Sequence, residues 1–237
     1  MGISGSGTLP LVMSTPHIAI DGPVGSGKTT VARNLARRLG ILYLDTGAMY
    51  RAVAFIALRA GVDTADEQAL IALVRAHPVH VDADETAPLG FRIYAGDEEL
   101  GEGLYDNQVS THASVAAAHP SIREELVARQ REIAQGAPVV MAGRDIGTVV
   151  LPDAGLKIFL TASVDARVRR RLAELAERGV QIEQSALRAQ VIERDLLDVN
   201  RPISPLRAAV DAIEIDSSAM SVPEVIEHIV SLVLARR

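Results

Sequence analysis

A glycine-rich stretch followed by lysine and threonine carries the clearest chemistry in this sequence. Residues 22–30 fit the pattern G-x-x-x-x-G-K-[ST], which is a phosphate-binding loop. The glycines let backbone N–H groups turn toward phosphate oxygens, and the helix N-terminus beyond them favours negative charge. Lys28 supplies a cation for the outer phosphates, and the Thr29 hydroxyl can bind Mg²⁺. The predicted phosphate site comprises Gly22, Pro23, Val24, Gly25, Ser26, Gly27, Lys28, Thr29 and Thr30.

The segments on either side of this loop are those that the motif requires. Residues 17–20 are short and mostly apolar, which predicts a buried strand. Val31, Leu35 and Leu39 then recur at helical spacing, and Gly40 predicts the end of that helix. A glycine-rich turn that matches the motif by chance is the alternative, and the strand–loop–helix context argues against it.

Composition limits the classes of protein and partner. The chain has 237 residues, 48% of them hydrophobic and 23% charged, with a net charge of −6. An acidic globular protein has no general attraction for nucleic acid, so anionic ligands must be held by local arginine clusters. There is no cysteine, which excludes disulfides and thiolate metal sites and is consistent with a reducing, cytoplasmic location. Only 3% of residues are aromatic, which argues against a base-stacking platform.

The residue types near the two ends of the sequence indicate neither a membrane-spanning segment nor a secretory signal. The apolar run 225–234 is short and is interrupted by Glu227 and His228. Residues 1–15 carry no positive charge and are rich in glycine, serine and threonine, so we expect a disordered extension.

An alternation of apolar runs and helical patterns follows the first strand. It predicts an α/β protein of the P-loop NTPase type, with a doubly wound, five-stranded parallel sheet. The five predicted strands cover residues 17–20, 41–44, 138–142, 156–160 and 212–216. Three short alternating runs, at 79–81, 91–94 and 98–100, predict a small antiparallel sheet inserted over residues 62–106. The core would then comprise residues 16–61 and 107–237, with Ser121 and Glu124 forming a capping box at the start of a long helix.

Polar motifs follow two further strands, at the sheet edge where doubly wound proteins bind ligands. Asp45-Thr46-Gly47 opens a helix that carries Arg51. Asp45 or Thr46 is most simply an N-cap, and Arg51 alone would be a solvated residue. Arg144 and Asp145 follow an almost wholly apolar strand and are bracketed by glycines, which favours a site over an ion pair closed on itself.

Two helical segments are rich in arginine. Arg167, Arg169, Arg170 and Arg171 repel one another unless an anion is present, which suggests a mobile lid over phosphates; a solvated charged face is the alternative. Arg194, Asp198 and Arg201 share one face farther along. That second group is either part of a site or an intrahelical ladder of ion pairs.

Taken together, these motifs resemble the bacterial cytidylate kinases, a family of nucleoside monophosphate (NMP) kinases. The resemblance extends from about residue 17 to residue 237. Its markers are IDGPVGSGKTT, LDTGAMYR, VSTHAS, IREELVARQR, AGRDIGTVVLPDA and ERDLLDVNRPISPL. Val24 stands where a small or hydroxyl residue is expected, and Thr46 stands where serine is frequent.

The resemblance implies transfer of the ATP γ-phosphoryl group to CMP or dCMP with Mg²⁺, in pyrimidine nucleotide metabolism. The inserted segment 62–106 would be the NMP-binding subdomain, and residues 163–180 the helical lid. ATP would bind at residues 22–30, with Thr29 at the metal. The implied catalytic residues are Lys28, Arg144, Arg167, Arg171 and Arg201. The implied CMP-binding residues are Thr46, Arg51 and Arg144 with Arg201 for the phosphate, Ser114, Arg123 and Asp145 for cytosine, and Arg194 and Asp198 for the ribose.

Two other functions compete with this interpretation. Among enzymes, the alternative is a kinase for another monophosphate, such as UMP, AMP or TMP. A nucleotide-dependent switch would share the phosphate loop, but the N-K-x-D motif of a GTPase is absent from the sequence. We expect a monomer that binds small nucleotides, with neither nucleic acid nor a membrane as a partner.

Overall fold

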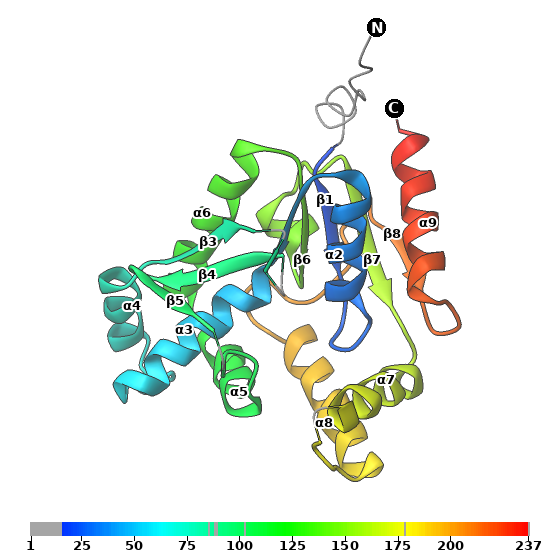
Figure 1. Ribbon diagram of the computed structural model, residues 1–237. Coiled ribbons are helices and arrows are strands. Elements are labelled where there is room, and N and C mark those ends of the chain that lie inside the picture. The colour runs from blue at the N-terminus through cyan, green and yellow to red at the C-terminus, as the bar shows by residue number, and fades with distance from the viewer. Residues whose placement is uncertain (1–15, 85, 88–89, 102, 178, 237) are drawn as a thin grey trace, which may run out of the picture.

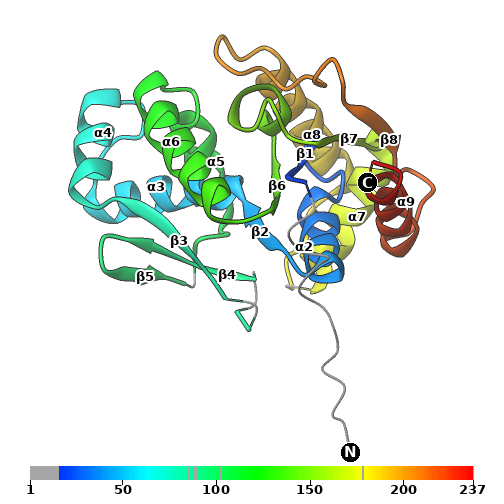
Figure 2. The ribbon, with the colours of Figure 1, turned by 90° about the horizontal axis from the view of Figure 1, so that it is seen from above.

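The computed structural model describes residues 16–84, 86–87, 90–101, 103–177 and 179–236. The predicted disordered extension, residues 1–15, lies outside the described residues. Figure 1 and Figure 2 show a large lobe, built on one sheet with α2, α7, α8 and α9, beside a small lobe that holds α3–α6 and a second sheet. Strands β2 and β6 run at the junction of these lobes (Figure 2).

The large lobe is built on a five-stranded, fully parallel sheet, as predicted. Its order is β2-β6-β1-β7-β8. The strands are β1 (Ile18–Asp21), β2 (Leu42–Asp45), β6 (Val139–Gly143), β7 (Leu156–Thr161) and β8 (Ile213–Asp216). All five predicted strands are therefore confirmed, with bounds that differ by at most one residue at either end.

Successive residues of the central strands pack into different cores. Ile18 and Ile20 join a cluster with α2 and α9, whereas Ala19 joins the cluster that includes α3 and α6. Val140 and Met141 of β6 divide in the same way. Both faces of the sheet are thus buried, which explains why these strands read as continuous apolar runs in the sequence.

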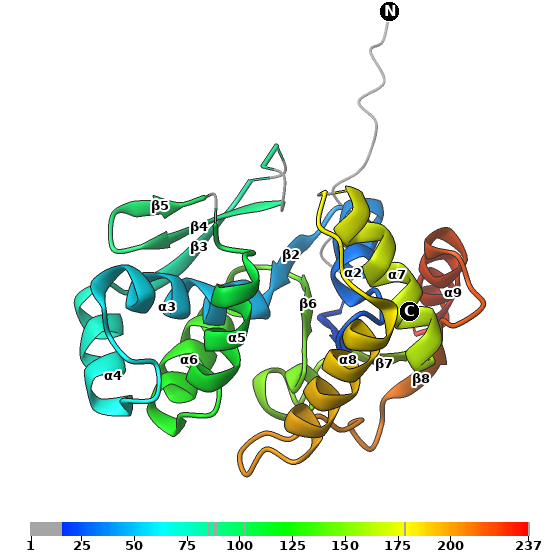
Figure 3. The same cartoon turned by 90° about the horizontal axis from the view of Figure 1, so that it is seen from below.

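Helices surround the sheet and build the small lobe. The described helices are α2 (Lys28–Leu39), α3 (Thr46–Ala60), α4 (Glu67–Ala76), α5 (Asn107–Ala116), α6 (Pro120–Gly136), α7 (Val164–Glu177), α8 (Gln184–Val199) and α9 (Val222–Leu234), together with a short π-helical turn, η1 (Ile146–Val150). Figure 3 shows α7 and α8 side by side below the large sheet, close to the start of α2. Among the described residues, none of the helices combines the length and apolar character needed to cross a bilayer.

The small sheet is antiparallel, as predicted. It consists of β3 (Val79–Ala83), β4 (Phe91–Ala95) and β5 (Glu98–Leu100). Its inward residues Phe91 and Ile93 share one hydrophobic cluster with Leu70 of α4, Met49 of α3 and Leu126 of α6. The inserted segment therefore packs on helices that come from outside residues 62–106.

One local prediction was wrong. The long helix α6 begins at Pro120 with His119 at its N-cap, so Ser121 does not start it and forms no capping box there. Proline is favoured in the first turn, where its missing N–H costs no hydrogen bond, and this moves the start upstream of Ser121. A capping box does occur at α9, between Ser221 and Glu224, where the sequence analysis did not identify it.

Strand register brings the three polar motifs to one edge. Asp21, the last residue of β1, lies opposite Gly143, and Asp45 of β2 lies opposite Ala142. Since parallel strands end on the same side, the phosphate loop, the start of α3 and the segment after β6 meet there.

Candidate functional site

The phosphate loop leaves β1 through a backbone that only glycine tolerates. Gly22 has a φ of 151°, and a Cβ at this position would lie 2.0 Å from the carbonyl oxygen of Leu160. The loop then delivers Lys28 to the first turn of α2. The buried Lys28 Nζ donates to the carbonyl oxygen of Pro23 at 2.6 Å.

The Lys28 amine is buried inside this loop among other charged groups. Burial lowers its pKa well below the ordinary value, and the Arg144 guanidinium lowers it further, while Asp45, Asp198 and Asp21 act in the opposite direction. A bound anion would favour the charged form of a lysine in these surroundings. Anion binding is the chemistry predicted for this loop.

At the start of α3, one aspartate both caps the helix and holds an arginine. Asp45 is the N-cap and accepts from the Gly47 N–H at 3.0 Å, so the simple capping interpretation holds for Asp45. Thr46 is the first helical residue, and its buried hydroxyl donates to the carbonyl oxygen of Ala142 at 3.0 Å. Asp45 also accepts from Arg51 at 2.9 Å. Arg51 is thereby fixed in the site rather than solvated, with 19% of its side chain exposed.

An aromatic ring supports the other side of Arg51. The guanidinium lies 4.4 Å from the ring centroid of Tyr105, a cation–π contact. Tyr105 follows the small sheet and was not predicted as a site residue. No spacing pattern marks such a ring, because its contact with Arg51 depends on the tertiary fold.

The two charged residues after β6 pair with distant partners and not with each other. Arg144 donates from Nε to Asp198 of α8 at 2.7 Å. Asp145 accepts from Arg123 of α6, and both of these side chains are buried. The alternative of a self-contained ion pair between Arg144 and Asp145 is therefore wrong. The segment instead joins α6 and α8, at the edge where the strands end.

The charged face of α8 is not an intrahelical ladder. Asp198 bonds Arg144, Arg194 reaches the carbonyl oxygen of Ser110 in α5 at 3.4 Å, and Arg201 donates to the carbonyl oxygen of Ser204. Burial lowers the pKa of Arg194, and Arg144, Arg51 and Arg201 lower it further. Three other guanidinium groups thus oppose the positive charge of Arg194.

Several donors in this cluster have no partner within the described part of the chain. They are buried Nε atoms, those of Arg51, Arg194 and Arg201. Buried donors without acceptors are costly, and mutually repelling cations add to that cost. An anion bearing several acceptor oxygens, such as a phosphate, satisfies both requirements.

The arginines of α7 differ in their surroundings. Arg167 is buried and donates to the carbonyl oxygen of Val24 at 3.1 Å and to Asp195 of α8 at 2.9 and 2.6 Å. Arg170 bonds the carbonyl oxygen of Ser26 at 3.3 Å and Ser217. Arg171 pairs with Glu174 at the surface. The solvated-face alternative therefore fails for Arg167 and Arg170, because both contact the phosphate loop.

Arg170 and Asp195 were missed as site residues. Arg170 belongs to the arginine run that the sequence analysis identified, and it lies on the same side of the helix as Arg167 and Arg171, but it was not assigned to the site. Asp195 lies directly after Arg194 in the marker ERDLLDVNRPISPL. The remaining predicted residue, Ser114, donates to the carbonyl oxygen of Ser110 within α5 and makes no hydrogen bond to the other site residues among those described.

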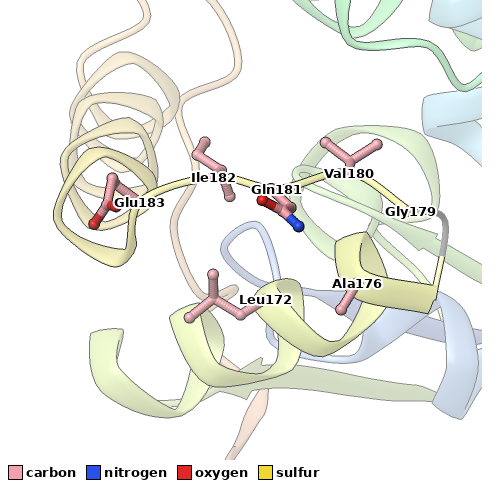
Figure 4. Close-up of a pocket in the computed structure, with 7 residues that line it drawn as sticks. All are labelled: Leu172, Ala176, Gly179, Val180, Gln181, Ile182 and Glu183. Carbon is pink, nitrogen blue, oxygen red and sulfur yellow. The ribbon is translucent and has the colours of Figure 1, made fainter.

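A hollow of about 630 Å³ at the far end of the α7–α8 hairpin is distinct from this site (Figure 4). Leu172 and Ala176 of α7 face the connecting segment that carries Val180 and Ile182. None of the residues that line it is a predicted site residue, so it takes no part in the arrangement above.

Comparison with known proteins identifies the family. The family model "Cytidylate kinase" matches residues 18–235. A cytidylate kinase of Pelotomaculum thermopropionicum is 50% identical over 224 residues, which cover 94% of this chain and 98% of the relative. A cytidylate kinase of Streptococcus suis is 46% identical over 217 residues, covering 92% and 96%.

A solved structure of an uncharacterized protein from Eubacterium ventriosum shares the fold. Its TM-score is 0.52 at 14% sequence identity, with 92% of this chain and 97% of that chain covered. The fold, the converging residues and the extent of these matches lead to one assignment. The chain belongs to the cytidylate kinase family.

Proposed function

We propose that this protein transfers the γ-phosphoryl group of ATP to CMP or dCMP, giving ADP and CDP or dCDP. The observation that carries the proposal is geometric: the strands that precede Lys28, Arg51 and Arg144 end at one sheet edge, and Arg144 bonds Asp198 of α8, three residues before Arg201. Phosphoryl transfer needs in-line positioning and positive charge more than covalent help from the protein. Arginine suits this task because its planar fork stays charged.

The donor and acceptor sites share this edge. Residues 22–30 hold ATP, with Lys28 at its outer phosphates. Thr46, Arg51, Arg144 and Arg201 hold the phosphate of CMP, and the free buried Nε atoms support such a role for Arg51 and Arg201. An oxygen of the CMP phosphate attacks the γ-phosphorus while the bond to ADP breaks. That oxygen is already a nucleophile, so no general base is required.

The buried Arg123–Asp145 pair reads the base. Cytosine presents an exocyclic amine donor beside N3 and O2 acceptors. Asp145 accepts from the amine, and Arg123 donates to the acceptors. Uracil would place a carbonyl against the carboxylate and leave both groups unsatisfied, which costs several kcal/mol. Ser114 completes this part, and Arg194 and Asp198 hold the ribose.

Mg²⁺ fits the loop because the exposed Thr29 hydroxyl stands at the start of α2, where the motif places a metal ligand. Among the described residues, His, Asp and Glu side chains form no metal-binding cluster, so the phosphates and water would complete the shell. When bound, the ion neutralises charge on the phosphates.

The inserted segment 62–106 borders the acceptor side, where its Tyr105 supports Arg51, and residues 163–180 act as the lid. Arg167 and Arg171 bring positive charge to the transferring group, and closure keeps water from ATP. The proposal includes a cytoplasmic location, which the lack of cysteine supports, and a monomeric state.

A coupled assay of ADP release tests the proposal with CMP, UMP, AMP and TMP as acceptors. We expect CMP to give the highest kcat/KM, and ADP release to depend on the acceptor. A preference for AMP or TMP would contradict the assignment. Slow ADP release without any acceptor would instead favour a nucleotide-dependent switch.

A further inference from the structure

A buried carboxylate lies directly behind the base-reading pair and has no role in the function proposed above. Asp21 is the last residue of β1 and is 4% exposed. Its two oxygens accept from the backbone N–H of Ile146 at 2.8 Å and of Gly147 at 2.7 Å. These amides are the first two of η1, 125 and 126 residues away in the chain.

These bonds replace the cap that Asp145 would normally provide. Asp145 occupies the N-cap position of η1, where aspartate commonly accepts from the first free N–H groups. Its side chain makes no such bond and pairs with Arg123 instead. At α3 and α4 the aspartates at the equivalent position, Asp45 and Asp66, do cap their own helices. Because Asp21 of β1 bonds these amides, Asp145 does not cap η1 and its carboxylate pairs with Arg123.

The backbone of η1 packs tightly against the Asp21 side chain. A Cβ added at Gly147 would lie 3.4 Å from Asp21 Oδ2 and 3.2 Å from Lys157 Cδ, so the backbone of η1 is packed against the carboxylate. Asp21 and Gly143 lie opposite each other in the parallel register. The strand that starts the phosphate loop thus also sets the position of the segment that carries Arg144 and Asp145.

We propose that Asp21 is a positioning residue for cytosine recognition: by capping η1 from β1, it holds the Asp145 carboxylate toward Arg123 and away from its own helix. This inference rests on the proposed role of Arg123 and Asp145 in reading the base. Burial, together with the nearby charge of Asp145, raises the pKa of Asp21, whereas the two N–H donors and Lys28 lower it. The position therefore costs free energy, which a merely space-filling residue would not require.

Two substitutions test the inference. Asp21→Asn keeps the shape but turns one acceptor into a donor that faces an N–H, and Asp21→Ser keeps a shorter cap. In both variants we expect Asp145 to turn back toward η1. The KM for CMP should rise about tenfold or more, and the preference for CMP over UMP should fall by a similar factor, since displacements of about 1 Å carry such costs. The KM for ATP should stay within about threefold.

Asp66→Asn is the matched control, because Asp66 also accepts from two first-turn N–H groups, those of Gln68 and Ala69, but lies in the exposed start of α4. It should leave the CMP-to-UMP ratio unchanged. The inference is overturned if Asp21→Asn and Asp21→Ser retain the wild-type ratio. It is also overturned if the variants lose ATP and CMP binding in parallel or do not fold, because that pattern indicates a general structural role.

Asp145→Asn separates this inference from the function on which it rests. If Asp145→Asn keeps the wild-type preference for CMP, the proposed base-reading role is wrong. If Asp145→Asn loses the preference while both Asp21 variants keep it, the base-reading role stands and only the inference about Asp21 fails.

Discussion

Single residues in this site carry charge at places where charge is costly. Lys28 is buried and has a lowered pKa, and Arg194 and Arg201 have pKa values lowered first by burial. A protein without a ligand gains little from such cations, because desolvation offsets their attraction to Asp198 and other carboxylates. Their placement is explained by the polyanion that the site is proposed to receive.

Lys28→Met should separate activity from stability. The substitution removes the cation but keeps the volume of the side chain. We expect kcat to fall by roughly 100- to 1000-fold, the usual cost of losing one transition-state charge contact. The free energy of unfolding, measured in urea, should stay the same or rise, because a desolvated cation is removed. Wild-type turnover in this variant would contradict the role of Lys28.

The free energy of unfolding of the unliganded protein should depend on pH through Asp21. Its pKa is raised to about 6 by burial, from an ordinary value near 3.8. The folded state therefore binds the proton more tightly than the unfolded state, so the contribution of Asp21 to stability is full below about pH 4 and is lost as pH rises through about 6. The difference amounts to about 3 kcal/mol.

The acid dependence is measured as the difference in unfolding free energy between the wild type and Asp21→Asn across this range of pH. As the pH rises, the free energy of unfolding of Asp21→Asn should increase relative to that of the wild type. A difference that stays constant between pH 4 and pH 6 would show that Asp21 titrates normally.

At the scale of elements, the hairpin of α7 and α8 connects the phosphate loop to the acceptor side. Arg167 spans Val24 in the loop and Asp195 in α8, while Asp198 of α8 holds Arg144. A movement of α8 thus alters contacts at both predicted substrate sites. This connection is consistent with the lid proposed for residues 163–180.

Two ion pairs between α7 and α8 offer a matched test of that connection. Arg167–Asp195 has exposed side-chain fractions of 5% and 23%, whereas Arg188–Asp165 has 48% and 71%. Asp195→Ala leaves a buried arginine unpaired and should lower the free energy of unfolding by about 2–3 kcal/mol. Asp165→Ala should cost less than about 1 kcal/mol. Equal losses in urea titrations would indicate that Arg167 is not held by Asp195.

The elements themselves could be predicted because their signals are local. The five parallel strands and the small sheet follow from apolar runs and alternation, and the phosphate loop follows from a motif whose glycines have a direct steric reason. The prediction for the start of α6 was wrong because two adjacent residues, Pro120 and Ser121, both favour a helix start.

The partners of the charged residues could not be predicted in this way. Spacing along α8 left open whether the charged residues form a site or a ladder, whereas the structure shows Asp198 bonded to Arg144 across the site. Asp21 likewise bonds a turn that lies more than a hundred residues away. Such contacts are set by strand register and tertiary packing, which leave no periodic trace in a single sequence. Tyr105 beneath Arg51 was missed for the same reason.

At the scale of the molecule, an acidic chain concentrates its useful positive charge between the lobes. The net charge is −6, yet Arg51 comes from the small-lobe helix α3, while Lys28 and Arg201 come from the large lobe. Figure 2 shows α3 and α2 on opposite sides of the strands β2 and β6, which run at the junction. A phosphate bound there would hold both lobes together and offset the repulsion among the arginines.

Ligand binding should therefore stabilise the whole fold through the phosphate. At a concentration of about 100 times its Kd, CMP is expected to add about 2.7 kcal/mol, which corresponds to a rise in Tm of roughly 5–10 °C for a chain of this size. Cytidine at the same concentration should give a much smaller rise. Differential scanning calorimetry provides the comparison, and equal shifts for both ligands would contradict a phosphate-centred site.

The most direct test of the central claim is a crystal structure with CMP and a non-hydrolysable ATP analogue. The account predicts the CMP phosphate among Arg51, Arg144 and Arg201, the cytosine amine against Asp145, and the γ-phosphate of the analogue near Lys28, in line with a CMP oxygen. CMP bound elsewhere, or those arginines turned to solvent with CMP in place, would contradict it.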